Sequence, residues 1–112
     1  MSLISTTDAT FAADVLASPM PVLVDFTASW CPPCVVIAPV LARIAHDERH
    51  RLRVVSLDVD AEPSTAATYQ VLGMPTLALF IDGEIVVRFV GAKPRTTILA
   101  LLEPHLTRVV PA

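Results

Sequence analysis

Two cysteines separated by two residues are the side chains of this sequence best suited to chemistry. Cys31 and Cys34 lie in the run Trp30-Cys31-Pro32-Pro33-Cys34, between an apolar segment and a helical pattern. Only the thiolate form of a cysteine attacks a disulfide. The unpaired N–H groups and the dipole at a helix N-terminus favour a thiolate on Cys31. Cys34 lies one turn further on, close enough to resolve a mixed disulfide. We therefore predict dithiol–disulfide exchange at this pair.

Two alternatives for the cysteine pair remain open at this point. Buried, inert thiols are common, but a Trp-Pro-Pro turn beside both cysteines is not a core pattern. A metal site would need more ligands, because two cysteines supply half of a tetrahedral shell. His46 follows Cys34 by about 18 Å along the helix axis and cannot complete that shell. His46 and His50 face each other only if the helix reaches His50. We predict no metal site.

Length and composition limit the classes of protein that fit. A chain of 112 residues is the size of one domain, so we expect residues 1–112 to form a single domain. Hydrophobic residues make up 54% and charged residues 17%, which favours a large buried core over disorder. The net charge of −3 argues against a nucleic-acid surface. The sequence shows neither a secretory leader nor a membrane span, so we expect a cytoplasmic monomer without membrane contact.

The order of predicted elements indicates an α/β fold. The strand predicted over 22–27 is almost continuously apolar, as in a strand covered on both faces. Asp82-Gly83 predicts a tight hairpin. We expect one mixed sheet of four to five strands, parallel in its first half and flanked by four helices. The predicted strands are 3–5, 22–27, 53–58, 76–81 and 84–90, and the predicted helices are 7–17, 33–47, 64–69 and one that begins near 94 and ends or bends at Pro104.

Several separated motifs give the sequence a resemblance to the thioredoxin family over about residues 11–106. They are Val24-Asp25-Phe26, Ala28-Ser29-Trp30-Cys31-Pro32-Pro33-Cys34, Ile37-Ala38-Pro39, Asp58-Val59-Asp60, Gly73-Met74-Pro75-Thr76, Asp82-Gly83 and Val90-Gly91-Ala92. The resemblance implies a thioredoxin fold and a protein disulfide reductase. In such an enzyme Cys31 attacks the substrate disulfide and Cys34 resolves the mixed disulfide.

Asp25 is an acid inside a buried apolar strand. Burial disfavours the charged carboxylate, so we expect the pKa of Asp25 to be raised toward neutral pH. The resemblance implies that this acid lies behind Cys34 and takes its proton, through water. The alternative is a hydrogen-bonded structural aspartate at the end of the strand.

The resemblance also implies the residues that contact the substrate. Pro75 matches the cis-proline of the family, beside which the Met74 backbone pairs with an extended substrate segment. The alternatives are a trans proline for Pro75 and simple core packing for Trp30 and Met74. The expected apolar, substrate-binding residues are Trp30, Pro32, Pro33, Met74, Pro75, Gly91 and Ala92.

The sequence departs from the common family pattern at four positions, one of which is Thr27, where many relatives have an aromatic residue. Pro32 stands where many thioredoxins have Gly, which removes a possible N–H donor to the Cys31 sulfur and predicts a less stabilised thiolate. Tryparedoxins also carry a Pro-Pro pair. Ser56 stands in place of a lysine near the buried acid, so Asp25 should be harder to ionise. Val35 also replaces a common lysine.

The partners implied by the resemblance are protein disulfides and a thioredoxin reductase. No bound cofactor is expected, because the Cys31–Cys34 disulfide itself carries the electrons. The alternatives are a thiol oxidase or isomerase of the same fold, and a redox-inert interaction module.

Overall fold

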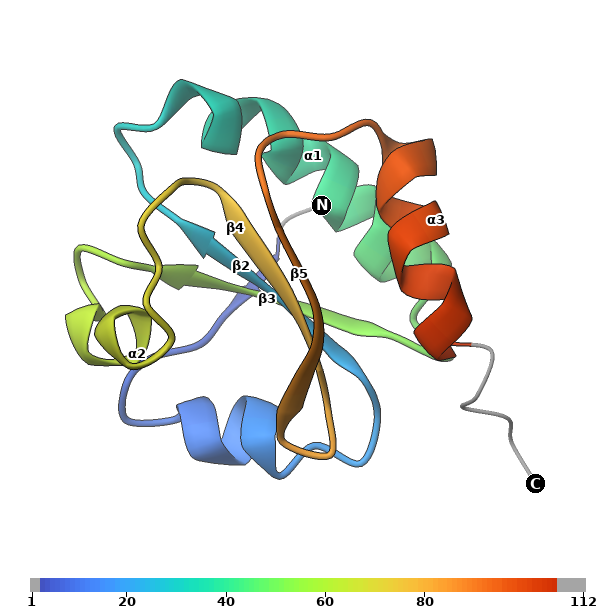
Figure 1. The fold of residues 1–112 in the computed structure, drawn as a ribbon, viewed down its shortest axis with the longest axis horizontal. Helices are drawn as coiled ribbons and strands as arrows, with labels where there is room; N and C mark the ends of the chain where they lie inside the picture. Colours follow the sequence, from blue (N-terminus) through green and yellow to red (C-terminus); the bar gives the residue numbers. More distant parts are fainter. Residues whose placement is uncertain (1–2, 107–112) are drawn as a thin grey trace.

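The computed structural model describes residues 3–106 of the chain. Five strands form one sheet, α1 and α3 cover one face, and α2 and the short π-helix η1 cover the other (Figure 1). The elements are β1 (Ile4–Ser5), η1 (Ala12–Leu16), β2 (Val22–Thr27), α1 (Pro32–Asp47), β3 (Arg53–Asp58), α2 (Pro63–Thr68), β4 (Thr76–Ile81), β5 (Glu84–Val90) and α3 (Arg95–Leu106).

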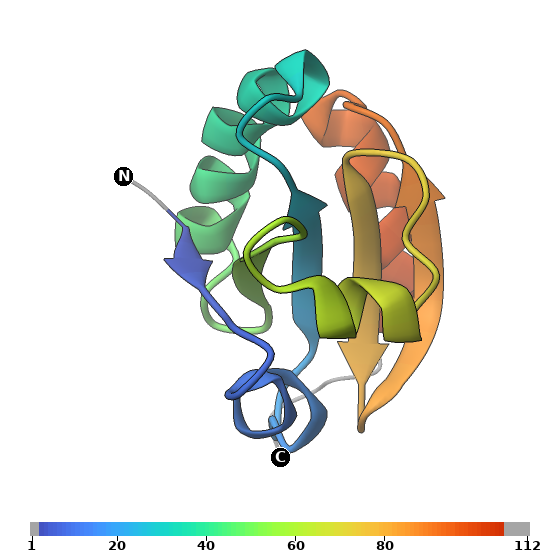
Figure 2. The same cartoon turned by 90° about the vertical axis from the view of Figure 1, so that its left-hand side faces the viewer.

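The sheet has the strand order β1-β3-β2-β4-β5 and is mixed. The central strand β2 pairs parallel with β3 and antiparallel with β4. β1 adds parallel to β3 at one edge, and β5 adds antiparallel to β4 at the other (Figure 2). The predicted mixed sheet flanked by four helices is therefore confirmed. All six residues of the predicted buried strand form β2, which has neighbours on both sides.

Alternation along β2 sends its side chains into two separate layers of core. Leu23 packs with Ile37, Leu41 and Ile44 of α1 and with residues of α3. Val22, Val24 and Phe26 instead pack against η1 and the end of α2. Because side chains alternate along a strand, Asp25 shares the face of Leu23 and lies under α1. The strand that ends at the cysteine motif thus also carries an acid toward the helix that begins with that motif.

The predicted hairpin between β4 and β5 is confirmed. Asp82 and Gly83 both have positive φ, 52° and 81°, as a type I′ turn requires. The register then shifts between Leu79 and Phe80, which leaves Val86 as an extra residue. Such a bulge changes which face the following residues occupy. As a result Arg88 can reach the chain that follows α2.

The prediction of a helix from Thr7 or Asp8 to residue 17 is wrong in its start and its type. A turn spans residues 8–10, and the helical part begins only at Phe11 and continues as the π-helix η1. The Asp8 carboxylate does not cap its own segment, because it accepts hydrogen bonds from the Ser64 and Thr65 N–H groups and the Thr65 hydroxyl. Asp8 therefore caps α2, more than fifty residues away in the chain.

Two predicted helix ends also differ from the structure. α3 continues through Pro104 to Leu106, whose side chain is buried in the same core cluster as Leu52 and Val54, so tertiary packing outweighs the tendency of proline to end a helix. α1 begins at Pro32, one residue earlier than predicted, and ends at Asp47. Within residues 3–106, no helix combines the length and apolar character needed to cross a membrane.

Candidate functional site

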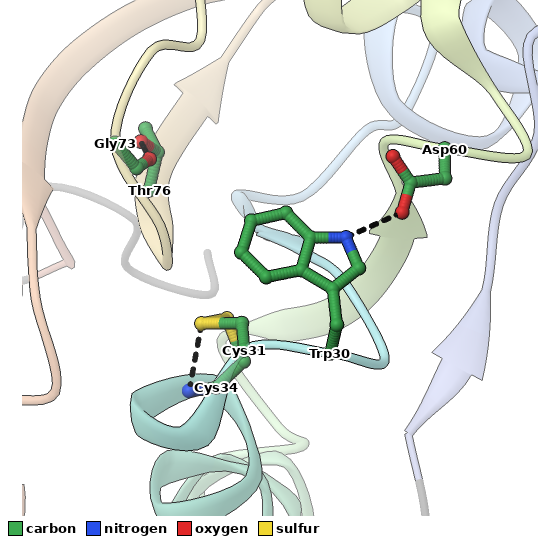
Figure 3. Close-up of a disulfide and its surroundings, with 6 residues drawn as sticks. All are labelled: Trp30, Cys31, Cys34, Asp60, Gly73 and Thr76. Atoms are coloured by element: carbon green, nitrogen blue, oxygen red, sulfur yellow. Dashed lines mark hydrogen bonds between the residues drawn. A yellow bond between two sulfur atoms is a disulfide. The ribbon is translucent and has the colours of Figure 1, made fainter.

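Cys31 caps the N-terminus of α1 with its sulfur. Its backbone is extended (φ −95°, ψ 109°), and its Sγ accepts a hydrogen bond from the Cys34 N–H at 3.3 Å (Figure 3). Cys31 and Cys34 form a disulfide, with their Cα atoms 5.3 Å apart. The cap geometry thus directs an N–H donor at the sulfur that the sequence predicts to be the nucleophile.

The two prolines remove competing donors from this helix end. Pro32 and Pro33 occupy the first two helical positions and have no N–H groups. The Val35 N–H donates a hydrogen bond to the Cys31 carbonyl at 3.2 Å. The Cys34 N–H is therefore the hydrogen-bond donor that α1 offers to the Cys31 sulfur, as predicted from the Pro-Pro pair.

The cysteines are buried although their neighbours are exposed. Cys31 is 3% and Cys34 2% accessible, whereas Trp30 is 64% accessible and both prolines are exposed. Ala28 is buried with the pair, and Val59 and Met74 pack against them. The disulfide lies at the base of an exposed turn. The interpretation of Trp30 as a core residue is therefore wrong.

The exposed Trp30 indole is held by an acid that the sequence analysis did not single out. Trp30 Nε1 donates a hydrogen bond to Asp60 Oδ2 at 2.7 Å (Figure 3). Asp58 Oδ1 accepts bonds from the N–H groups of Asp60 and Ala61, which fixes this loop. Asp60 was visible in the sequence only as part of a family motif. Its contact with Trp30 spans thirty residues of chain and leaves no local pattern.

The Met74–Pro75 peptide bond is cis, as the family resemblance implied. Met74 is half-buried and packs against the group of Ala28, Cys31 and Cys34. The Gly91 N–H donates to the Pro75 carbonyl at 2.9 Å, which brings the end of β5 against this loop. Gly91 has a φ of 107°, which side-chain-bearing residues rarely adopt. Ala92 follows it and is exposed.

Asp25 is buried beneath α1 without full hydrogen bonding. It is 2% accessible, and among the described residues its Oδ1 has no hydrogen-bond partner. Burial raises the pKa of Asp25 to about 7. The raised pKa is the one expected from burial of an acid in an apolar strand. Ser56 is the register partner of Asp25 on β3 and supplies no positive charge.

Two adjoining hollows connect Asp25 and the back of the disulfide to solvent. Asp25 lines one of them, and Cys34 lines the other. Three residues line both hollows: Thr27, Ala38 and Ser56. Water entering these hollows can reach the acid and the second cysteine.

A metal has little support from the donors in the described part of the chain. No group of three or more His, Cys, Asp or Glu side chains is arranged to hold an ion within residues 3–106. His46 lies in the last turn of α1, far along the helix from Cys34. α1 ends before His50, so the two histidines do not share a helix face.

Comparison with known proteins agrees with the geometry. The family model described as Thioredoxin matches residues 2–104. The chain is 52% identical over 108 residues to "Thioredoxin" of Mycobacterium tuberculosis, which covers 96% of this chain and 90% of the relative. It is 47% identical over 100 residues to "Thioredoxin 1" of Synechococcus elongatus, covering 89% and 94% of the two chains.

A further relative has a composite name. "Bifunctional thioredoxin reductase/thioredoxin" of Mycobacterium leprae is 50% identical over 108 residues, covering 96% of this chain and 23% of that protein. Matches of this extent and identity, joined to a cysteine pair at the start of a helix, establish the family and its dithiol–disulfide chemistry. The chain belongs to the thioredoxin family.

Proposed function

We propose that this protein reduces disulfides of other proteins, with Cys31 as nucleophile. The Cys31 thiolate attacks one sulfur of the substrate disulfide, forms a mixed disulfide and releases the other substrate sulfur as a thiolate. Cys34, as thiolate, then attacks Cys31 Sγ. The Cys31–Cys34 disulfide forms, the second substrate thiolate leaves, and two electrons have moved to the substrate. The cap contact from the Cys34 N–H to Cys31 Sγ is the observation that carries this assignment.

Asp25 is proposed as the proton acceptor of the resolving step. Its pKa of about 7 allows the carboxyl to take and return a proton near neutral pH. Water in the adjoining hollows provides the connection between Asp25 and Cys34, with Thr27 and Ser56 lining the path. Desolvation by burial is the cause that raises the pKa of Asp25. Ser56 supplies no positive charge that would oppose this rise.

The substrate is proposed to lie across the exposed turn and the chain before β4. Exposed apolar surface at Trp30, together with the Met74 backbone, suits an extended polypeptide with loose side-chain requirements. The proposed contact residues are Trp30, Pro32, Pro33, Met74, Pro75, Gly91 and Ala92.

The proposed electron donor is a thioredoxin reductase. The M. leprae relative carries both activities in its name, which supports a pairing of the two proteins. In this proposal residues 1–112 work as one domain, a cytoplasmic monomer, with no cofactor beyond the redox-active disulfide.

Trapping with single-cysteine variants tests the assignment of roles. Cys34→Ser should accumulate a mixed disulfide between Cys31 and a reducible protein such as insulin, because the resolving thiol is missing. Cys31→Ser should trap no substrate, and both variants should lose multiple turnover. Mass spectrometry identifies the linked cysteine. Trapping through Cys34 alone would reverse the roles, and trapping through neither would exclude reductase function.

A further inference from the structure

The loop between α2 and β4, residues 69–75, carries the most exposed large apolar side chain of residues 3–106. Leu72 is 94% accessible, compared with 67% for Val36 and 64% for Trp30. It precedes Met74, which packs against the disulfide, by two residues. Two residues of chain span at most about 7 Å. Leu72 therefore lies at the edge of the exchange site, although nothing in its local sequence marks it as functional.

Arg88 of β5 holds the beginning of this loop. Its guanidinium donates hydrogen bonds to the carbonyls of Tyr69 and Gln70, the latter at 2.9 Å. Gln70 has a φ of 54°, so the chain turns sharply here as it leaves α2. Two donors from one planar group fix both the position and the direction of this turn.

The end of the loop is held as well. The Thr76 hydroxyl donates to the Gly73 carbonyl, and Gly73 lies against Val90 of β5. A Cβ on Gly73 would come within 3.0 Å of Val90 Cγ1, so glycine allows this close approach. Figure 3 shows Gly73 and Thr76 across the Trp30 ring from Asp60. Leu72 is thus an exposed side chain between two fixed points.

An exposed leucine on a fixed backbone is well suited to binding. Little backbone freedom is lost when a partner covers it, and apolar area is removed from water. The adjacent Val90 is 52% accessible and continues the apolar surface. A protein whose disulfide reaches Cys31 brings the residues beside that disulfide near Met74, which lies two residues from Leu72.

We infer that Leu72 is a specificity-determining residue that binds an apolar side chain of the partner protein, next to the disulfide being exchanged. Arg88 is a positioning residue for the loop that presents Leu72. This inference rests on the proposed function, since it concerns which disulfides are preferred. The covalent exchange itself remains with Cys31 and Cys34.

Two synthetic peptides, each closed by one disulfide, test the inference. They are identical except for leucine or lysine at the position two residues from a cysteine. Hydroxyethyl disulfide, which carries no amino-acid side chain to contact Leu72, serves as a third substrate. The reduced protein should show a kcat/KM about 5- to 10-fold higher for the leucine peptide than for the lysine peptide, mainly through KM.

Leu72→Ser should remove this preference, and Leu72→Glu should reverse it in favour of the lysine peptide. Ile4→Ser is the matched control, because Ile4 is also an exposed apolar residue (61%) but lies on β1 at the opposite edge of the sheet (Figure 2). Ile4→Ser should keep the preference of the unmodified protein.

Arg88 variants test positioning separately from contact. Arg88→Met should raise KM for the leucine peptide about threefold while kcat stays near its normal value, because the loop loses its anchor. Arg88→Lys should recover part of this loss. A merely structural role would lower kcat for hydroxyethyl disulfide to the same extent, and circular dichroism confirms folding.

Equal kcat/KM values for the two peptides, or an unchanged preference in Leu72→Ser, would overturn the inference. Either result leaves the proposed function standing if hydroxyethyl disulfide and insulin are still reduced. If the unmodified protein reduces none of these substrates, the proposed function itself fails.

Discussion

The two sides of the Cys31–Cys34 disulfide differ in solvent accessibility and in polarity. The outer side carries exposed apolar groups, Trp30 at 64% and Leu72 at 94% accessibility. The inner side carries Asp25, which is 2% accessible and lies beneath α1 beside Ser56. Apolar surface on the outer side is suited to binding a partner protein, whereas a desolvated acid on the inner side is suited to accepting and returning a proton. Substitutions on the two sides should therefore affect different measurable quantities.

This division arises from one continuous stretch of chain. β2 carries Asp25 into the core, the next residues turn outward at Trp30, and α1 then begins at the cysteine pair. Alternation along the strand sets the position of the acid, and the prolines set that of the helix end. Substitutions on the inner side, on the outer side and at the boundary between them test whether recognition and protonation are separable.

Replacing the inner acid should have the largest effect, and it should be on stability. The pKa of Asp25 is raised from 3.8 to about 7 in the folded protein, so the folded state binds more protons than the unfolded state between these pH values. The free energy of unfolding of the unmodified protein should fall by about 4 kcal/mol as pH rises through this window. Asp25→Asn should lose this dependence and be the more stable protein at pH 8, as urea unfolding can measure.

The same unfolding experiment can also contradict the assignment of the titrating group to Asp25. A parallel pH dependence of unfolding in Asp25→Asn and the unmodified protein would show that Asp25 is not the group that titrates. Asp14→Asn is a suitable control, because hydrogen bonds from Thr10 and Thr6 lower the pKa of Asp14. At pH values above the ordinary pKa of an aspartate, Asp14→Asn should be less stable than the unmodified protein, whereas Asp25→Asn should be more stable.

Removing the outer aromatic group should raise KM without changing the pH profile. Trp30→Ala should increase KM for a protein disulfide about 10-fold, since the ring is 64% accessible and directly precedes Cys31. Asp60→Asn should have a smaller effect, because it weakens the hydrogen bond to the indole and keeps the ring. A shift in the pH profile of Trp30→Ala would contradict the separation of the two sides.

Introducing a cation on the inner side should move the protonation equilibrium. Ser56→Lys places a positive charge in register with Asp25 and should lower the pKa of Asp25 by about one unit. Carboxyl chemical shifts measured against pH report this value directly. KM for protein disulfides should stay the same, and a changed KM with an unmoved pKa would argue against the division.

The smallest expected effect lies at the boundary between the two sides. Pro32→Gly restores an N–H group at the first position of α1, so the pKa of the Cys31 thiol should fall by about half a unit. Absorbance of the thiolate during a pH titration measures it. An unchanged thiol pKa would mean that the Cys34 N–H alone sets the sulfur environment.

Sequence patterns predicted the strands and the dithiol–disulfide chemistry, because both depend on residues that are close together in the sequence. The apolar run of β2, the Asp82-Gly83 hairpin and the cysteine spacing are determined by neighbouring residues. The cis form of Pro75 was accessible through family resemblance alone. A buried acid in an apolar strand was enough to predict a raised pKa for Asp25.

Contacts between distant segments escaped prediction. The Asp8 side chain caps α2 instead of its own segment, and Arg88 anchors the loop after α2. Pro104 stays inside α3, where packing of Leu106 decides the end of the helix. Each of these depends on side chains meeting in three dimensions, which periodicity along the chain does not encode.

If the buried acid accepts the proton of the resolving step, the release rate from a preformed mixed disulfide should depend on the protonation of Asp25. A fluorescent peptide linked to Cys31 is released in a single turnover, measured from pH 5 to 9 with Cys34 intact. For the unmodified protein the rate should show an inflection near pH 7, the pKa of Asp25. Asp25→Asn should lack this inflection and release the peptide roughly 100-fold more slowly at pH 7. Identical rate profiles for the two proteins would contradict the account.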